Sequence, residues 1–142
     1  MKYIFFSIFF LISFINFHSQ NAAEILIYGD DISYDKDKNI IAKGKAKILY
    51  QNKIITSDLI IYSRDNGNVI LPVEFGLKDE KDNYYFGSNG VFINNLENGT
   101  INDAKILLND GSRIVGIKAK RLKDIDIITK GVYSPCTSRI KI

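Results

Sequence analysis

The sequence after residue 23 predicts an all-β fold. Its apolar residues are mainly Ile, Val and Tyr, which favour the pleated, half-buried positions of a sheet. Apolar and polar residues alternate in several short runs, and turn signals separate these runs at spacings of about 10 to 16 residues. Residues 118–126 come nearest to a helical period, but the Ile-rich end of this stretch favours a strand. These observations together predict a sandwich, roll or barrel.

The first 23 residues differ in composition from everything that follows. Lys2 supplies a positive charge, and residues 3–17 form an apolar run that holds six of the nine Phe. This run has the length of the apolar region of a signal peptide and is short for a membrane span. Ala22-Ala23 are small enough for cleavage, although Asn21 departs from the usual pattern of small residues. We expect residues 1–23 to be a signal peptide, with an uncleaved anchor as the alternative.

The predicted strands then follow one another along the chain, each ended by a polar turn. Alternation places every second side chain of a strand on the same face of the sheet. The clearest alternating runs are 32–34, 46–50, 58–62 and 106–108. The turn signals lie at 35–39, 51–52, 64–67, 78–83, 98–99 and 109–111.

A weak internal repeat accompanies these strands. Residues 30–34 resemble residues 57–62, and similar segments occur at 88–93 and 118–122, so the spacing is about 27 to 31 residues. Each unit has room for two strands joined by a hairpin. A period of this length is typical of stacked units that bury their apolar faces on their neighbours.

The composition argues against most catalytic chemistry. The single His lies at residue 18, so the chain after residue 23 has no His for Ser-His or Cys-His catalysis and no Cys/His zinc spacing. Acidic pairs such as Asp30-Asp31 and Asp79-Glu80 are better interpreted as turn residues than as acid/base groups. The net charge of +3 is small and its Lys residues are dispersed, which does not suit nucleic acid. We therefore expect neither an enzyme nor a cofactor or metal.

The order of several motifs resembles the OstA-like domain of the periplasmic lipopolysaccharide-transport family, which is shared by LptA and the N-terminal part of LptD. An acidic strand start is followed by an A-x-G-x-A-x-I pattern, and a second strand reads S-D-L-I-I-Y. A G-x-V element follows, and the Y-S-P-C run near the C-terminus is similar to the element before the outer-membrane barrel of LptD. The segments concerned are 31–35, 41–48, 54–62, 67–69 and 131–136.

This resemblance implies an antiparallel β-jellyroll, folded like a taco, over residues 24–138, with 139–142 as a short tail. It also implies a periplasmic domain, associated with the outer membrane, that shields the acyl chains of lipopolysaccharide and helps to deliver it. A barrel follows this domain in LptD, so we expect a truncated or split copy. Such a copy either pairs with a separately encoded outer-membrane barrel or is a remnant.

Candidate lipid-binding residues are those that alternation places on the inward faces of the strands. Each of them also has a plain interpretation as a residue of a closed core, and an open roll allows both. The candidates are Ile32, Tyr34, Ile48, Tyr50, Ile60, Tyr62, Phe92, Ile106 and Leu108.

The edges of an open roll are candidate pairing surfaces, because their backbone groups are unpaired. The resemblance implies head-to-tail pairing with similar domains, here through residues 24–28 and 126–133. It also implies an intermolecular disulfide for Cys136 with a barrel subunit, for which a leftover free thiol is the alternative. Two other classes of protein compete with the lipid carrier: a small outer-membrane β-barrel and an envelope β-domain without a lipid role.

Overall fold

The computed structural model describes residues 24–93, 96–123 and 125–135. The expected signal peptide, Cys136 and the tail at 139–142 lie outside these residues. The described part of the chain contains eleven strands and no helix. The strands are β1 (Ile25–Tyr28), β2 (Asp31–Tyr34), β3 (Ile40–Tyr50), β4 (Lys53–Tyr62), β5 (Val69–Leu71), β6 (Phe75–Lys78), β7 (Tyr84–Ile93), β8 (Asn98–Leu107), β9 (Arg113–Leu122), β10 (Ile125–Thr129) and β11 (Val132–Ser134).

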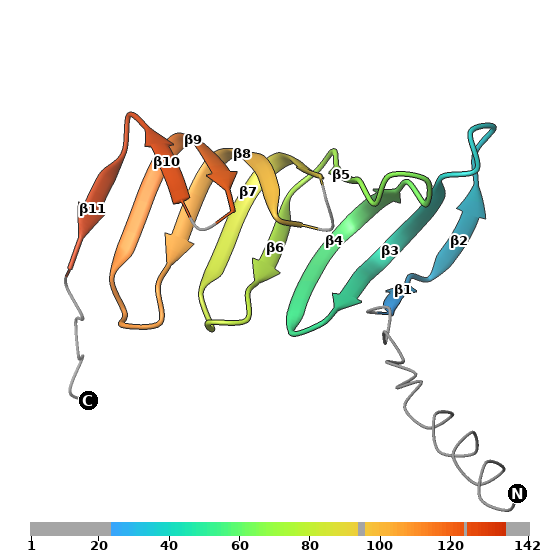
Figure 1. The fold of residues 1–142 in the computed structure, drawn as a ribbon, viewed down its shortest axis with the longest axis horizontal. Helices are drawn as coiled ribbons and strands as arrows, with labels where there is room; N and C mark the ends of the chain where they lie inside the picture. Colours follow the sequence, from blue (N-terminus) through green and yellow to red (C-terminus); the bar gives the residue numbers. More distant parts are fainter. Residues whose placement is uncertain (1–23, 94–95, 124, 136–142) are drawn as a thin grey trace, which may run out of the picture.

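All eleven strands belong to one antiparallel sheet. Its main order is β1-β3-β4-β5-β7-β8-β9-β10, so most neighbours in the sheet are also neighbours in sequence. Figure 1 shows the strands side by side along the long axis, from β2 at one end to β11 at the other. The predicted all-β antiparallel fold is therefore confirmed.

The short strands combine in pairs across the sheet. Both β1 and β2 pair with β3, both β5 and β6 pair with β4 and β7, and both β10 and β11 pair with β9. Each such pair therefore takes the place of one long strand that is interrupted at its middle. The sheet has eight strand positions along its length, and each position is divided into two halves.

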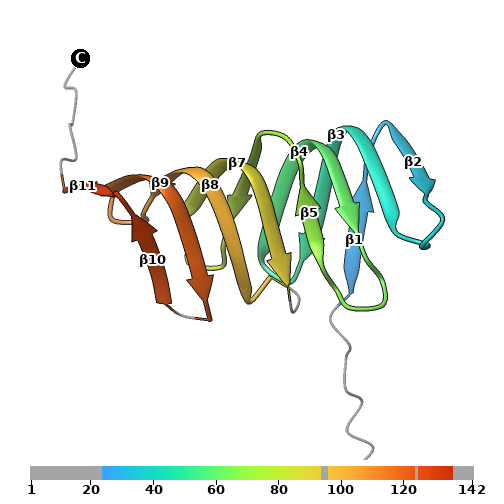
Figure 2. The same cartoon turned by 90° about the horizontal axis from the view of Figure 1, so that it is seen from above.

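The long strands bend at the same level at which the short pairs are interrupted. In β3 the register shifts between Lys43 and Ala46, where Gly44 and Lys45 adopt positive φ values of 69° and 47°. Asn89 in β7 and Asp103 in β8 also have positive φ, and the register shifts beside both. Bulges of this kind bend a strand and increase its twist. Their alignment folds the whole sheet along one crease, over which the strands arch in Figure 2.

The crease divides the sheet into two arms. The first arm holds 25–28, 46–50, 53–57, 75–78, 84–87, 104–107, 113–115 and 132–134. The second arm holds 31–34, 40–43, 59–62, 69–71, 90–93, 98–102, 118–122 and 125–129.

The four copies of the sequence repeat have equivalent places in this fold. They end on β2, β4, β7 and β9, and each contributes its strand to the second arm. These strands alternate along the sheet with β3, β5 and β8. The repeat therefore reflects a unit of two strands, as its length predicts.

The core lies between the inner faces of the two arms. One inner row crosses the first arm through Ile27, Ile48, Ile55, Leu77, Tyr85, Ile106, Ile114 and Tyr133. The facing row crosses the second arm through Tyr34, Ile40, Tyr62, Val69, Phe92, Gly99, Arg121 and Asp126. Rings from the two arms meet edge to face where Phe75 contacts Phe92, with centroids 6.0 Å apart.

The predicted turn at Asn98-Gly99 is wrong, because both residues begin β8. Gly99 lies directly opposite Phe92, and a Cβ on Gly99 would come within 2.5 Å of a Phe92 ring carbon. The glycine is therefore needed for close packing against an aromatic ring rather than for a reversal of the chain.

Candidate functional site

An open apolar groove lies at the β1/β2 end of the molecule. β1 contributes Ile25 and Ile27 from the first arm, and the second arm contributes the other wall. The groove has a volume of about 450 Å³, within the range of roughly 300–1,000 Å³ that is typical of small-molecule sites. Its second wall consists of Ile32, Tyr34, Ile40, Tyr62 and Arg64.

The groove exists because the inner rows of both arms continue to the last strand of the sheet. Further along the sheet, neighbours on both sides bury the inner residues, and Ile48 is only 1% exposed. At the end, no described strand lies beyond β1 and β2, so Ile32 is 46% and Tyr34 is 66% exposed. Large apolar side chains thus face the space between the arms without complete cover.

One positive charge lies at the border of this groove. Arg64 follows β4 in the turn at 63–68, and among the residues that line the groove it is the only charged one. Burial, together with nearby Tyr50, raises the pKa of Tyr62, so its phenol stays neutral at physiological pH. The groove therefore combines an apolar wall, two phenol groups and one guanidinium.

The candidate lipid-binding residues occupy three kinds of place. Ile32, Tyr34 and Tyr62 line the end groove. Tyr50 and Leu108 are half-buried and pack against the core. The remaining candidates, Ile48, Ile60, Phe92 and Ile106, are buried in the core itself.

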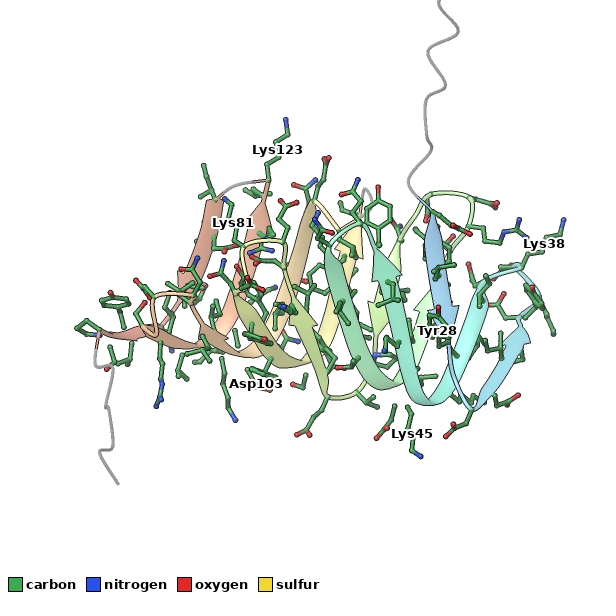
Figure 3. The ribbon with its side chains drawn as sticks, turned by 90° about the horizontal axis from the view of Figure 1, so that it is seen from below. Tyr28, Lys38, Lys45, Lys81, Asp103 and Lys123 are labelled. Carbon is green, nitrogen blue, oxygen red and sulfur yellow. The ribbon has the colours of Figure 1, made fainter. Side chains whose placement is uncertain are left out.

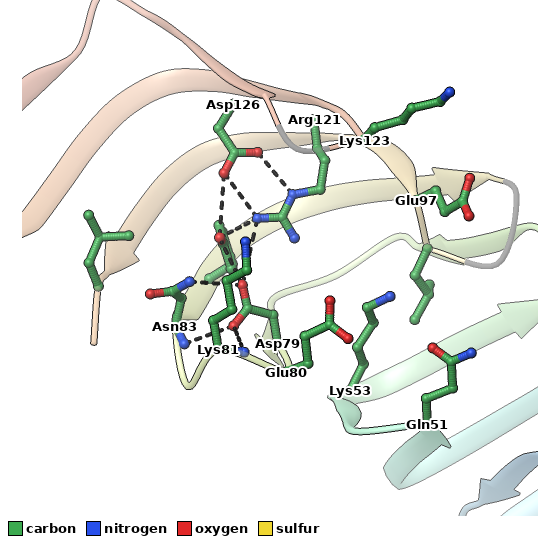
Figure 4. A pocket seen from close by; sticks show the side chains of 13 residues that line it. Gln51, Lys53, Asp79, Glu80, Lys81, Asn83, Glu97, Arg121, Lys123 and Asp126 are labelled. Atoms are coloured by element: carbon green, nitrogen blue, oxygen red, sulfur yellow. Dashed lines mark hydrogen bonds and ion pairs between the residues drawn. The ribbon is translucent and has the colours of Figure 1, made fainter. Parts of the chain in front are cut away.

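A second, polar cavity lies where the free ends of the two arms face each other, a region that we call the mouth. It has a volume of about 620 Å³. The first arm reaches it through Gln51, Lys53 and the turn at 79–83, and the second arm through Glu97 and Lys123 (Figure 4). Figure 3 places Lys81 and Lys123 along one long edge of the molecule, opposite Lys45 and Asp103 at the crease.

Four polar side chains cross the mouth and join the arms; we call this group of Asp79, Tyr85, Arg121 and Asp126 the clasp. The Arg121 guanidinium donates to Asp126 through Nε–Oδ1 at 2.9 Å and Nη2–Oδ2 at 3.0 Å. Its Nη2 also donates to the Tyr85 hydroxyl, and its Cζ lies 4.2 Å from the centroid of the Tyr85 ring. The Tyr85 oxygen lies 3.2 Å from Oδ2 of Asp79. Tyr85 lies in the first arm, on β7, and Asp79 follows β6 of the same arm. Arg121 and Asp126 lie in the second arm. Figure 4 shows Asp79 facing Arg121 and Asp126.

The turn that follows β6 holds Asp79 in place. The Asp79 carboxylate accepts hydrogen bonds from the backbone N–H groups of Lys81 and Asn83, both at 2.9 Å, and from the Asn83 side chain at 3.0 Å. Asp35 makes the same set of bonds to Asp37 and Asn39 in the turn after β2. The two turns share the pattern D-x-x-x-N. Only Asp79 also faces the opposite arm, where Arg121 lies 3.9 Å away.

Burial and charge fix the protonation of the clasp. Burial alone would raise the pKa of Asp79, but hydrogen bonds from Asn83, Lys81 and Tyr85 outweigh burial and hold the pKa below its ordinary value. Burial, opposed by Arg121, raises the pKa of Tyr85 to about 12. Burial also disfavours the Arg121 cation, but Asp126 and Tyr85 outweigh it and raise the pKa. Across a broad range of pH, the clasp therefore combines the neutral phenol of Tyr85, the Arg121 cation and the Asp79 carboxylate.

Little free space remains beneath the clasp. The void between Leu77, Tyr85, Phe92 and Arg121 is about 10 Å³, about the least that holds a single water molecule. The apolar space between the arms is therefore nearly filled beneath the clasp, although the polar mouth beside it is open.

The two ends of the sheet are its edges, because no further strand of the described chain lies beyond them. β1 and β2 form one edge, and β10 and β11 form the other. Ile125, Val132 and Tyr133 are among the most exposed apolar side chains. The first expected edge, at 24–28, coincides with β1, and β2 extends it. The second, at 126–133, covers most of β10 and part of β11, and Ile125 extends it.

The described residues include no group of three or more His, Cys, Asp or Glu side chains that could hold a metal ion. A search of the same residues for a helix long and apolar enough to cross a membrane finds none.

Comparison with known proteins shows the fold and no family. No family model matches the chain, and no curated protein sequence matches it. Among solved structures, the chain is similar to LptH of Pseudomonas aeruginosa, described as the LptA homologous periplasmic component of the conserved lipopolysaccharide transport device. The TM-score is 0.62 and the identity is 14%, over 75% of this chain and 82% of LptH. The chain thus has the β-jellyroll fold of this transport component.

The clasp is the feature that the sequence did not reveal. The sequence predicts a turn role for Asp79, which is correct but incomplete, and no role for Tyr85. A signal was present: alternation in 118–122 puts Arg121 on the same face as Ala119, which is buried. An arginine on an inward face needs a partner, and this need could have directed attention to Asp126 and Tyr85.

Proposed function

We propose that this protein is a periplasmic carrier module that binds the acyl chains of lipopolysaccharide between its two arms and passes the lipid toward the outer membrane. The observation that carries the proposal is the end groove, in which Ile25, Ile27, Ile32, Tyr34 and Tyr62 face a space that opens at the β1/β2 edge. The jellyroll fold shared with LptH supports the same function.

The chemistry of the groove suits one acyl chain near its headgroup. Each methylene group that leaves water for an apolar wall contributes roughly 0.8 kcal/mol. Ile32 and Tyr34 offer such a wall because both are exposed on the inner side of β2. Arg64 at the border can bind a phosphate of the headgroup as a bidentate donor. Binding of this kind needs no covalent step and no cofactor.

Assembly with similar domains is part of the proposal. The edges at β1/β2 and β10/β11 are each able to accept a further strand through backbone hydrogen bonds. Pairing at the first edge would also extend the groove walls into the next module. A separately encoded outer-membrane barrel is the proposed partner at the outer end of such a chain.

A structural envelope domain without a lipid role is the second candidate. The observation in its favour is the filled interior beneath the clasp, where only about 10 Å³ is free. A domain of this kind would use the same edges for assembly and leave the groove empty.

Mass spectrometry of the protein purified without detergent, from cells that make lipopolysaccharide, tests the proposed function. Co-purified lipid A or lipopolysaccharide is the expected result. A folded, β-rich protein that carries no lipid would contradict the carrier function and favour the structural domain.

A further inference from the structure

We infer that the clasp of Asp79, Tyr85, Arg121 and Asp126 ends the lipid path within this module and so selects acyl chains by length. The inference rests on the proposed function, and it concerns what happens to a chain after it enters the end groove. Tyr85 and Arg121 are the residues that determine this specificity.

The inner row of the second arm changes character along the sheet. From β2 to β7 it presents Tyr34, Ile40, Tyr62, Val69 and Phe92, all apolar or aromatic. These five positions cover four strand spacings, or about 19 Å at 4.8 Å per spacing. The row then continues through Gly99 to Arg121 and Asp126 on β9 and β10. An acyl chain that crosses the strands therefore meets apolar side chains first and charged ones afterwards.

The apolar part can admit a chain at little polar cost. Side chains from both arms, such as Ile48 and Ile60, belong to one buried cluster of apolar residues. If the arms separate around a chain, these residues exchange one apolar neighbour for another, and no hydrogen bond is broken between side chains. The groove shows the first stage of such a separation, because its walls at Ile27 and Ile32 already stand apart.

The clasp resists the same separation. Arg121 is 17% exposed in its side chain and Asp79 is 6% exposed, so moving the arms apart would strip buried charges of their partners. Breaking a buried pair by removing one partner is strongly unfavourable. A methylene chain has no donor or acceptor to replace the lost bonds.

The small void beneath the clasp supports the inference that an acyl chain ends there. It is about 10 Å³ in volume and is lined by Tyr85, Arg121 and Asp126 together with Leu77, Phe92 and Ala119. At most about one water-sized group fits there while Tyr85 and Arg121 keep their positions, so an acyl chain cannot continue through it. An apolar replacement of the clasp would continue the inner row to β10 and join this void to the path.

The test uses the full mature protein and a triple variant, Tyr85→Phe, Arg121→Met and Asp126→Leu. Apolar replacement of a complete buried ion pair is often neutral or stabilising, so this variant is expected to fold. Asp79 keeps its three bonds to Lys81 and Asn83. The matched control replaces the exposed pair Lys78–Asp82, 2.7 Å apart, by Met and Asn. Circular dichroism and thermal unfolding establish that all three proteins are folded.

The readout is displacement of a fluorescent fatty acid by saturated fatty acids from decanoic to octadecanoic acid. For the wild type and the control, affinity should rise with chain length and then stop rising. For the triple variant the plateau should move to longer chains, with octadecanoic acid bound at least tenfold more tightly than by the wild type. The same plateau in wild type and triple variant would overturn the inference and leave the carrier function intact.

The remaining outcomes separate the inference from the proposed function. If neither protein binds any of the acids, both are contradicted. If only the triple variant binds, the clasp is confirmed as a block on the path, while the wild type is not a carrier of single acyl chains.

Discussion

The two ends of this folded sheet are built from the same alternating strands and yet behave in opposite ways. At the β1/β2 end, the inner rows finish in Ile27, Ile32 and Tyr34, and the arms leave a groove of about 450 Å³. Near β9 and β10, the inner row finishes in Arg121 and Asp126, and the arms are joined across the mouth. A few inward residues thus decide whether the space between the two arms is an open groove or is crossed by polar contacts.

The largest effect is expected for the strand edges on which the proposed assembly depends. Ile27→Pro in β1 and Ile128→Pro in β10 each remove a backbone N–H and fix φ, which disrupts strand pairing. We expect each change to abolish chemical crosslinking into chains of modules. Assemblies that persist in both variants would exclude edge pairing.

Removal of Arg121 should be costly, whereas removal of Tyr34 should not. Arg121→Ala leaves Asp126 and the buried Asp79 without their cation, and we expect a loss of about 3 kcal/mol in the free energy of unfolding. Tyr34→Ala removes a side chain that is 66% exposed, and we expect a change below about 0.5 kcal/mol. Urea denaturation measures both. Equal losses would show that the two ends do not differ in the way described.

Tyr34 contributes little to stability but should matter for lipid binding. Tyr34→Ser removes part of the groove wall, and we expect binding of a fluorescent fatty acid to weaken about tenfold, or about 1.4 kcal/mol. Tyr28→Ser is the matched control, because Tyr28 lies on the same sheet edge but alternates to the outer face. A loss of affinity in the Tyr28 variant alone would place the lipid on the outer face.

The last predicted effect is a dependence of stability on pH that comes from the clasp. The pKa of Asp79 is lowered in the folded protein, so its contribution is complete above the unfolded pKa of about 4 and is lost as the pH falls through the folded value. The pKa of Tyr85 is raised to about 12, so its contribution is complete below an unfolded pKa of about 10 and is lost as the pH rises toward 12.

Thermal unfolding across the pH range checks this dependence. The wild type should lose stability below pH about 4 and above pH about 10. Tyr85→Phe should remove most of the alkaline loss and leave most of the acid loss. An unchanged alkaline loss in this variant would show that Tyr85 is not its source.

The fold was predictable because it follows from local signals. Alternation fixes which face of a strand is buried, and D-x-x-x-N turns such as 35–39 fix where the chain reverses. The clasp was not predictable in the same way, because Tyr85 and Arg121 are 36 residues apart and meet only when the sheet folds along its crease. The turn predicted at Asn98-Gly99 is wrong for a related reason. Gly99 is required because the ring of Phe92 packs against it, and this contact is not visible in the sequence around Gly99.

We expect lipid to occupy the groove at the β1/β2 end. Site-specific photo-crosslinking in cells that make lipopolysaccharide tests it directly, with the photoreactive residue at Tyr34 on the groove wall or at Tyr28 on the outer face of the same edge. We expect a lipopolysaccharide adduct from position 34 and none from position 28. Adducts of equal yield at both positions, or none at position 34, would contradict the claim.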